Sequence, residues 1–131
     1  MGTSWGEFRM ANEKRVLVLD DEPIVGDRLK DAFEKEGMEV EVFRDSLLAI
    51  ERLKEQPFAV LVTDMKMSGP SGMDVLRFVK EKNPATRVIV ITGYATIETN
   101  YEAQALGADH FLAKPFKTKD LVKLVEKALK G

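Results

Sequence analysis

Cysteine is absent from this 131-residue sequence, and histidine occurs only once. The chain therefore offers no disulfide, no thiolate metal ligand and no cysteine nucleophile. It has no run of lysine and arginine and its net charge is −2, which argues against direct binding of nucleic acid. Its longest apolar runs are too short to span a bilayer, and its first residues lack the apolar stretch of a signal peptide. We therefore expect a cytoplasmic protein without a membrane partner.

The residues that are present suffice for one folded domain. Hydrophobic residues make up 44% of the chain and charged residues 32%, a balance typical of globular proteins and not of disordered segments. Residues 1–13 show no hydrophobic period, so we expect a leader or an expression-derived tail without ordered structure there. The alternative is a docking arm built on Trp5 and Phe8. The patterned domain covers residues 14–131.

Short apolar runs alternate with stretches of helical spacing along the patterned region. The expected strands are 16–19, 40–43, 59–62, 88–91 and 111–112. The expected helices are 23–36, 46–55, 73–82, 96–106 and a last one capped by Thr118. Successive parallel strands need crossover helices, and those crossovers are right-handed. The pattern predicts an α/β fold with a single doubly wound parallel sheet, a flavodoxin-like (βα)5 domain with strand order 2-1-3-4-5.

Polar and charged residues follow all five expected strands, and those after the second, Arg44 and Asp45 at the expected edge of the sheet, are assigned no role. The acidic run 20–22 follows the first, Asp64 the third, Thr92 the fourth and Lys114 the fifth. In such sheets the site lies beyond the carboxyl ends of the strands. Carboxylates about 4 Å apart repel by roughly 4 kcal/mol at an effective dielectric near 20, and a hard divalent cation removes that cost. Oxygen ligands alone favour Mg²⁺ or Mn²⁺, and a hydroxyl and an ammonium beside them indicate phosphoryl transfer to an aspartate.

Four sequence segments then point to one family. They are VLVLDDEP, LVTDMKMSGPSG, VIVITGYA and the pair Lys114–Pro115. Each is weak alone, since an apolar run followed by DDE also ends a Walker B strand, but the ordered set resembles the signatures of response-regulator receiver domains of bacterial two-component systems. The resemblance implies a switch that accepts a phosphoryl group from a histidine kinase or a histidine phosphotransfer protein. Such a domain catalyses only its own aspartyl phosphorylation and dephosphorylation.

The resemblance implies a metal site around the phosphoacceptor. Asp64 matches the acceptor itself. Asp20 and Asp21 match the acidic pair that holds Mg²⁺ or Mn²⁺, with Asp21 favoured as the direct ligand. Lys66 matches the position whose backbone carbonyl binds the metal. Receivers often carry proline four residues after the acceptor, where this chain has Ser68, and that difference puts the stiffness of the loop in doubt.

The resemblance also implies a set of switch residues. Thr92 matches the hydroxyl that moves to the phosphoryl group, and Lys114 matches the lysine that contacts a phosphoryl oxygen. Phe111 matches the aromatic switch position, and without a hydroxyl it would act through packing alone. The face made by the fourth helix, fifth strand and fifth helix is expected to bind an output domain or protein, or to form a phosphorylation-linked homodimer.

Other readings of the same residues remain open. Asp20, Asp21 and Glu22 could cap the first helix, since carboxylates favour that position. The chain could be a pseudo-receiver, an interaction module that keeps the fold without being phosphorylated. A dehalogenase-type phosphatase would need a second aspartate two residues after a nucleophilic one on the first strand, and a flavodoxin would need a hydroxyl-rich phosphate loop there. The acidic run 20–22 meets neither requirement.

Overall fold

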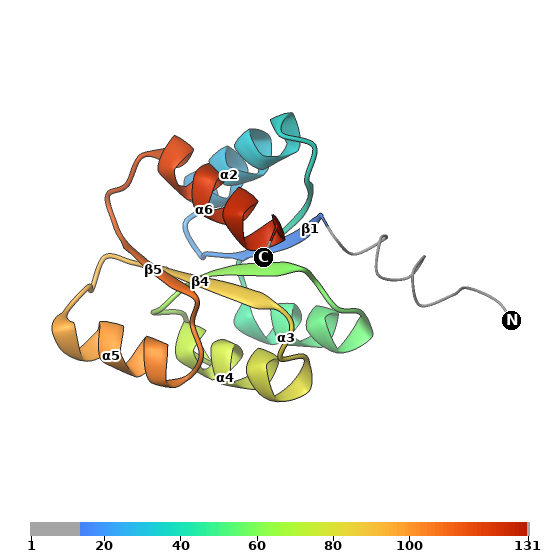
Figure 1. Cartoon of the computed structure of the whole chain (residues 1–131). Coiled ribbons are helices and arrows are strands. Elements are labelled where there is room, and N and C mark those ends of the chain that lie inside the picture. The colour runs from blue at the N-terminus through green and yellow to red at the C-terminus, as the bar shows by residue number, and fades with distance from the viewer. Residues whose placement is uncertain (1–13, 131) are drawn as a thin grey trace, which may run out of the picture.

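The computed structural model describes residues 14–130, which fold as strands and helices in strict alternation (Figure 1). Its strands are β1 (Arg15–Leu19), β2 (Glu39–Phe43), β3 (Val60–Asp64), β4 (Arg87–Thr92) and β5 (His110–Ala113). Its helices are α2 (Pro23–Lys35), α3 (Ser46–Glu55), α4 (Gly72–Lys82), α5 (Ile97–Ala105) and α6 (Thr118–Lys130). The expected leader or tail at residues 1–13 lies outside the described residues.

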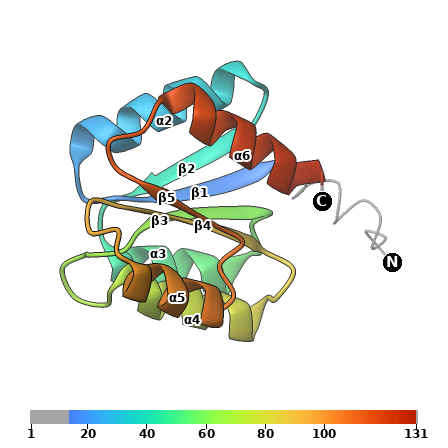
Figure 2. The ribbon, with the colours of Figure 1, turned by 60° about the vertical axis from the view of Figure 1, so that its left-hand side comes forward.

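The strands form one parallel sheet in the order β2-β1-β3-β4-β5, which confirms the predicted fold class. Helices α2 and α6 cover one face of the sheet, and α3, α4 and α5 cover the other (Figures 1 and 2). Strand β1, between β2 and β3, supplies both cores, because alternate residues of a strand point to opposite faces. Leu17 and Leu19 pack under α3 and α4, whereas Val16 and Val18 pack under α2 and α6.

Strands β3 and β4 end later than their apolar runs predict. β3 continues through Asp64 and β4 through Thr92, because the ladder between them extends to the pair Asp64–Ile91. A parallel strand covered on both faces is held by backbone pairing even where its side chains turn polar, as at the fully buried Thr63. Asp64 and Thr92, the expected acceptor and switch hydroxyl, are therefore the last residues of two buried strands.

The start of the last helix also differs from the sequence-based expectation. Helix α6 begins at Thr118 instead of being capped by it. The carbonyl of Lys117 accepts hydrogen bonds from the N–H groups of Asp120 and Leu121, so the helical bonding starts one residue before the helix. The predicted cap was wrong by one position, which is the usual uncertainty of a helix end.

Helix α5 packs more loosely than the other helices. Ala103 is its one buried residue within the part of the chain described, and Ile97 and Tyr101 are 77% and 73% exposed. By contrast, α6 buries Leu121, Val125 and Ala128. Most helical stability in proteins comes from packing an apolar face. Helix α5 buries the smallest apolar face of the five helices described, so this packing stabilises it least.

Past its carboxyl end, α5 is followed by an ionic cluster built on Asp109. The Asp109 carboxylate accepts from Val88 N–H at 2.8 Å, from Lys80 Nζ at 3.3 Å and from an Arg87 guanidinium nitrogen at 3.3 Å. Lys80 also donates to the carbonyl of Thr86 at 2.7 Å. The cluster ties the turn after α5 to α4 and to the start of β4.

Replacing Asp109 by alanine should lower the free energy of unfolding by about 2 kcal/mol, because the Val88 N–H and the Lys80 ammonium lose their shared acceptor. Urea unfolding at neutral pH measures this loss. The Asp109→Asn variant keeps an acceptor for the Val88 N–H and should lose less. Equal stability of the alanine variant and the parent protein would contradict this account.

The same pair of proteins tests the pH dependence. Burial alone would raise the pKa of Asp109, but the Val88 N–H and the Lys80 ammonium outweigh it, so the pKa lies below its ordinary value of 3.8. A depressed carboxyl pKa stabilises the fold above the unfolded value and loses that effect as the pH falls through the folded one. The stability difference between Asp109→Ala and the parent should therefore persist at neutral pH and shrink in acid.

Candidate functional site

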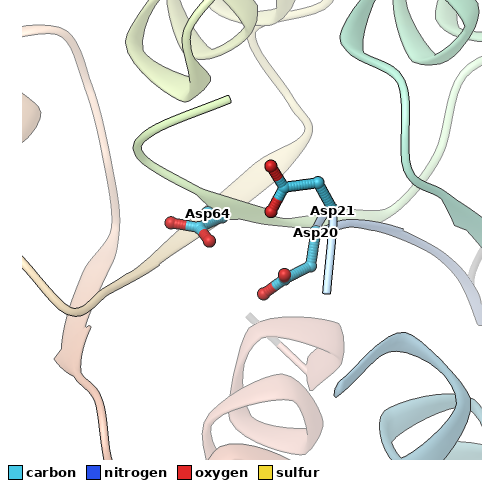
Figure 3. Close-up of side chains that lie close together, drawn as sticks. All are labelled: Asp20, Asp21 and Asp64. Carbon is cyan, nitrogen blue, oxygen red and sulfur yellow. The ribbon is translucent and has the colours of Figure 1, made fainter. Parts of the chain in front are cut away.

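Three aspartates meet at the carboxyl ends of β1 and β3. Asp20 follows β1, is fully buried, and accepts from the N–H of Glu22 at 2.9 Å. Asp64 ends β3 and is nearly buried, whereas the neighbouring Asp21 is exposed. One carboxylate oxygen from each aspartate lies within 4.8 Å of the others (Figure 3). The structure thus brings together the three carboxylates that the sequence predicted.

Lys114 bridges these carboxylates from the end of β5. Its Nζ lies 3.0 Å from Asp20 Oδ2, 3.0 Å from Asp64 Oδ2 and 2.7 Å from Glu22 Oε1. Burial alone would lower the pKa of Lys114, but its hydrogen bonds to the three carboxylates outweigh burial and raise that pKa well above the ordinary value. The side chain is therefore charged at any physiological pH.

At Asp20, burial is the dominant influence on the pKa. It raises the pKa of Asp20, and the hydrogen bonds from Glu22 N–H and Lys114 oppose that rise only in part. A carboxylate that is kept out of water and placed beside another one needs a cation close by. Lys114 supplies one positive charge, which leaves the cluster of carboxylates with a net negative charge.

A divalent cation fits this donor set. The cluster offers carboxylate oxygens only, which suits Mg²⁺ or Mn²⁺, and one member is exposed, so that water can complete the coordination shell. Lys66 lies two residues after Asp64 in the sequence, and its backbone nitrogen lies 3.4 Å from Asp64 Oδ1. The role of its carbonyl as a metal ligand stays a prediction.

Thr92 lies at the end of β4, next to β3. Its side chain is fully buried, and its Oγ1 accepts from the N–H of Tyr94 at 2.9 Å. That bond uses a lone pair of the oxygen, so the hydroxyl keeps its own hydrogen for donation. Its carbonyl accepts from the N–H of Lys114 at 2.7 Å, which ties the ends of β4 and β5 together. Phe111 of β5 is half-buried and packs against the core that contains Ala103 of α5.

The loop after Asp64 is held without the proline that the family often has there. Ser46 Oγ donates to the carbonyl of Ser68 at 3.2 Å, and Gly69 provides a positive φ of 74°. The N–H of Gly72 donates to the carbonyl of Met65 at 2.8 Å and closes the loop. These bonds connect the loop to α3 and close it on itself without a proline at position 68.

Two contacts at the site were missed at the level of sequence. Glu22 belongs to the same acidic run as Asp20, and the topology rule could have placed it beside Lys114. The other contact joins two loops: Lys66 Nζ lies 4.0 Å from the centre of the Tyr94 ring, a cation–π geometry. No spacing in the sequence indicates that pair, because 28 residues separate its members.

These features define a class: doubly wound α/β domains with a carboxylate site for a cation at the carboxyl ends of the sheet. Residues 16–126 match the family model described as the response regulator receiver domain. The chain belongs to that family, which implies signalling by phosphorylation as part of a two-component system. Receiver domains are signalling domains and not classical enzymes, and they bind Mg²⁺ at their acidic pocket.

Curated relatives agree with this assignment. The chain is 36% identical over 116 residues to the response regulator receiver protein CpdR of Brucella abortus, covering 88% of this chain and 97% of CpdR. It is 31% identical over 119 residues to the response regulator protein PilR of Pseudomonas aeruginosa, covering 91% of this chain but 27% of PilR. The similarity to PilR thus concerns one domain of a longer protein.

Solved structures show the same fold. The beryllofluoride-activated NtrC4 receiver domain dimer superposes with a TM-score of 0.84 at 35% identity, covering 89% of this chain and 97% of that one. A response regulator of Burkholderia pseudomallei, solved with a phosphorylated aspartic acid, calcium ion and citrate, gives a TM-score of 0.81 at 26% identity. That match covers 89% of this chain and 69% of the other.

Among residues 14–130 of the present chain, no helix combines the length and apolarity needed to cross a membrane.

Proposed function

We propose that this domain is a phosphorylation-activated switch whose acceptor is Asp64 and whose reaction depends on Mg²⁺. The observation that carries the proposal is the cluster of three carboxylates within 4.8 Å, with Lys114 Nζ 3.0 Å from the acceptor. A sensor histidine kinase or a histidine phosphotransfer protein would supply the phosphoryl group. We expect the reaction to take place in the cytoplasm, without direct binding of nucleic acid.

Each residue of the site then has a role in the transfer of the phosphoryl group. Asp20 and Asp21 hold the cation, which supplies positive charge to the phosphoryl oxygens when it is bound. An Asp64 oxygen attacks phosphorus while the bond from phosphorus to the donor imidazole nitrogen breaks, and the imidazole keeps the electron pair. Lys114 then contacts a phosphoryl oxygen, and the Thr92 hydroxyl donates to another.

The product changes the charge of the site. An aspartyl phosphate adds negative charge comparable to the roughly −1.5 to −2 of other phosphorylated side chains. We expect the Thr92 side chain to turn toward it and to give up the bond from Tyr94 N–H, which would free the start of the segment leading to α5. Phe111 packs against the core cluster that contains Ala103 of α5, so it would repack if α5 moves.

The output surface is the face made by α5, β5 and α6. Ile97 and Tyr101 stand out from α5 into solvent, as does Tyr94 just before it. An output domain, a partner protein or a second copy of the chain would cover them when the switch is on. The dimeric state of the activated NtrC4 receiver domain supports the last of these.

We expect the donor protein to dock in a groove of this chain beside Asp64. A cavity of about 330 Å³ lies between α2 and the segment leading into α6, and Glu22 and Lys114 line it as well as the site. Its other walls combine apolar groups with a cation. They are formed by Val25, Arg28, Leu29, Pro115, Phe116 and Thr118. A groove that opens onto the site would let a donor present its phosphohistidine to Asp64.

The test is a mass measurement after incubation with a small phosphodonor. With Mg²⁺ and phosphoramidate, the intact protein should gain the mass of one phosphoryl group, and the gain should disappear when Mg²⁺ is omitted. The Asp64→Asn variant should not gain mass, whereas Asp27→Asn, an exposed acid on α2, should behave as the parent does. No gain in the parent protein would favour the pseudo-receiver, an interaction module that is not phosphorylated.

A further inference from the structure

Glu22 makes the shortest of the three contacts to Lys114. Its Oε1 lies 2.7 Å from Lys114 Nζ, against 3.0 Å for each of the two buried aspartates. Glu22 is not part of the cluster that could hold a cation, which consists of Asp20, Asp21 and Asp64. Its carboxylate contacts Lys114 and is not among the three grouped around the candidate cation site.

The backbone of Glu22 is fixed while its side chain is free to serve Lys114. Glu22 is the N-cap residue of α2, its N–H donates to Asp20, and its carbonyl accepts from Val25 and Gly26. An N-cap side chain normally accepts from the first turn of its helix. That of Glu22 makes no such bond. It is 59% exposed and reaches to Lys114 instead.

A bound cation and the Lys114 ammonium compete for the same carboxylates. Lys114 Nζ contacts Asp20 and Asp64, which are two of the three members of the cation cluster. Like charges this close repel strongly. The Lys114 side chain is 17% exposed, so it needs a partner outside the cluster when it gives up these two.

We propose that Glu22 is a positioning residue for Lys114: it holds the ammonium at the edge of the site once a cation occupies Asp20 and Asp64. Lys114 then waits between the metal and the groove that both residues line, where the incoming phosphoryl group arrives. This proposal rests on the proposed function and adds to it a residue whose action passes through Lys114.

Binding of Mg²⁺ to the unphosphorylated protein tests the proposal without any measure of transfer. Isothermal titration calorimetry should show that Glu22→Gln weakens Mg²⁺ binding by about fivefold, the factor that one partly exposed charge-assisted bond is worth. Without Glu22, Lys114 stays on Asp20 and Asp64 and competes with the metal. The control Asp27→Asn removes the same charge from an exposed site on α2 and should change the affinity less than twofold.

The decisive comparison repeats Glu22→Gln in a Lys114→Met background. If Glu22 acts through Lys114, the fivefold effect should fall there to the size seen for Asp27→Asn. An effect of the same size with and without Lys114 would overturn the proposal, because Glu22 would then act on the cation directly.

A measurement on the parent protein avoids reliance on the Lys114 variant. The NMR signal of the Lys114 ammonium should remain protected from exchange when Mg²⁺ is added, and it should lose this protection in Glu22→Gln. Loss of protection in both proteins would count against Glu22. A parent protein that binds no Mg²⁺ would overturn the proposed function as well, whereas a parent that is phosphorylated but shows no coupling would overturn only the role of Glu22.

Discussion

The Lys114→Met variant should lose about 3 kcal/mol of stability without a divalent cation and regain much of it when Mg²⁺ is added. The substitution removes the ammonium that lies 3.0 Å from both Asp20 and Asp64, and both of those carboxylates are buried. Taking one partner from a buried charged group leaves a charge without compensation, which is among the costliest single changes. Mg²⁺ would replace the missing charge at the same oxygens.

Thermal unfolding with and without Mg²⁺ measures this effect. The rise in Tm on adding Mg²⁺ should be larger for Lys114→Met than for the parent protein. Lys117→Met, at an exposed lysine three residues further on, changes the net charge equally and should leave both values near those of the parent. A Lys114→Met variant as stable as the parent in the absence of metal would contradict the assignment.

The metal-free variant should also respond to pH. Burial already raises the pKa of Asp20, and loss of Lys114 removes two of the effects that hold it down. A carboxyl whose pKa is raised in the folded state contributes stability at low pH, and this contribution is lost as the pH rises through the folded value. The deficit of Lys114→Met should therefore shrink as the pH is lowered from 7.

The Gly72→Ala variant should lose about 3 kcal/mol or more of stability, because the first turn of α4 touches the backbone of Asp64. A Cβ on Gly72 would lie 1.8 Å from the Asp64 carbonyl oxygen, 2.8 Å from the Asp64 carbonyl carbon and 2.9 Å from Met65 Cα. All three atoms belong to the backbone of buried residues, so no flexible side chain can give way. Crowding of a packed region usually costs about 1–3 kcal/mol, and this contact is far closer than most.

Urea unfolding and Mg²⁺ titration together test that prediction. The affinity for Mg²⁺ should fall as well, because relief of the clash has to move Asp64 or α4. Gly93→Ala is the matched control: Gly93 follows Thr92 at the same end of the sheet, and a Cβ there would meet no atom within 4 Å. That variant should stay within about 0.5 kcal/mol of the parent. A stable Gly72→Ala protein with unchanged affinity would show that α4 can shift freely.

Most of the fold could be predicted from the sequence because the signals were redundant. Continuous apolar runs such as Val16–Leu19 are typical of parallel strands covered on both faces, and the helices between them leave few topologies open. The ends of β3 and β4 could not be predicted, because backbone pairing carries both strands past their apolar residues to Asp64 and Thr92. A hydrophobic pattern depends on side chains alone. It does not indicate where backbone hydrogen bonding between strands continues past the last apolar residue.

The sequence predicted which side chains meet at this edge of the sheet, but it did not predict the hydrogen bonds between them. The rule for strand ends brings Asp20, Asp64 and Lys114 to one edge, although 94 residues separate the first from the last. Which oxygen binds which proton depends on side-chain conformations that no spacing encodes. For that reason the shortest contact of Lys114, with Glu22, emerged only from the structure.

Helix α5 is held mainly beyond its carboxyl end, so its amino end can move further than its carboxyl end. The ionic cluster around Asp109 fixes the turn beyond its carboxyl end, while along its length Ala103 alone is buried. A helix of nine residues is about 14 Å long, so a tilt of about 20° around the fixed end carries the other end through about 5 Å. The moving end begins at Thr96, four residues after the Thr92 hydroxyl. A change of hydrogen bonding by one small side chain would thus be converted into a displacement that a partner protein can recognise.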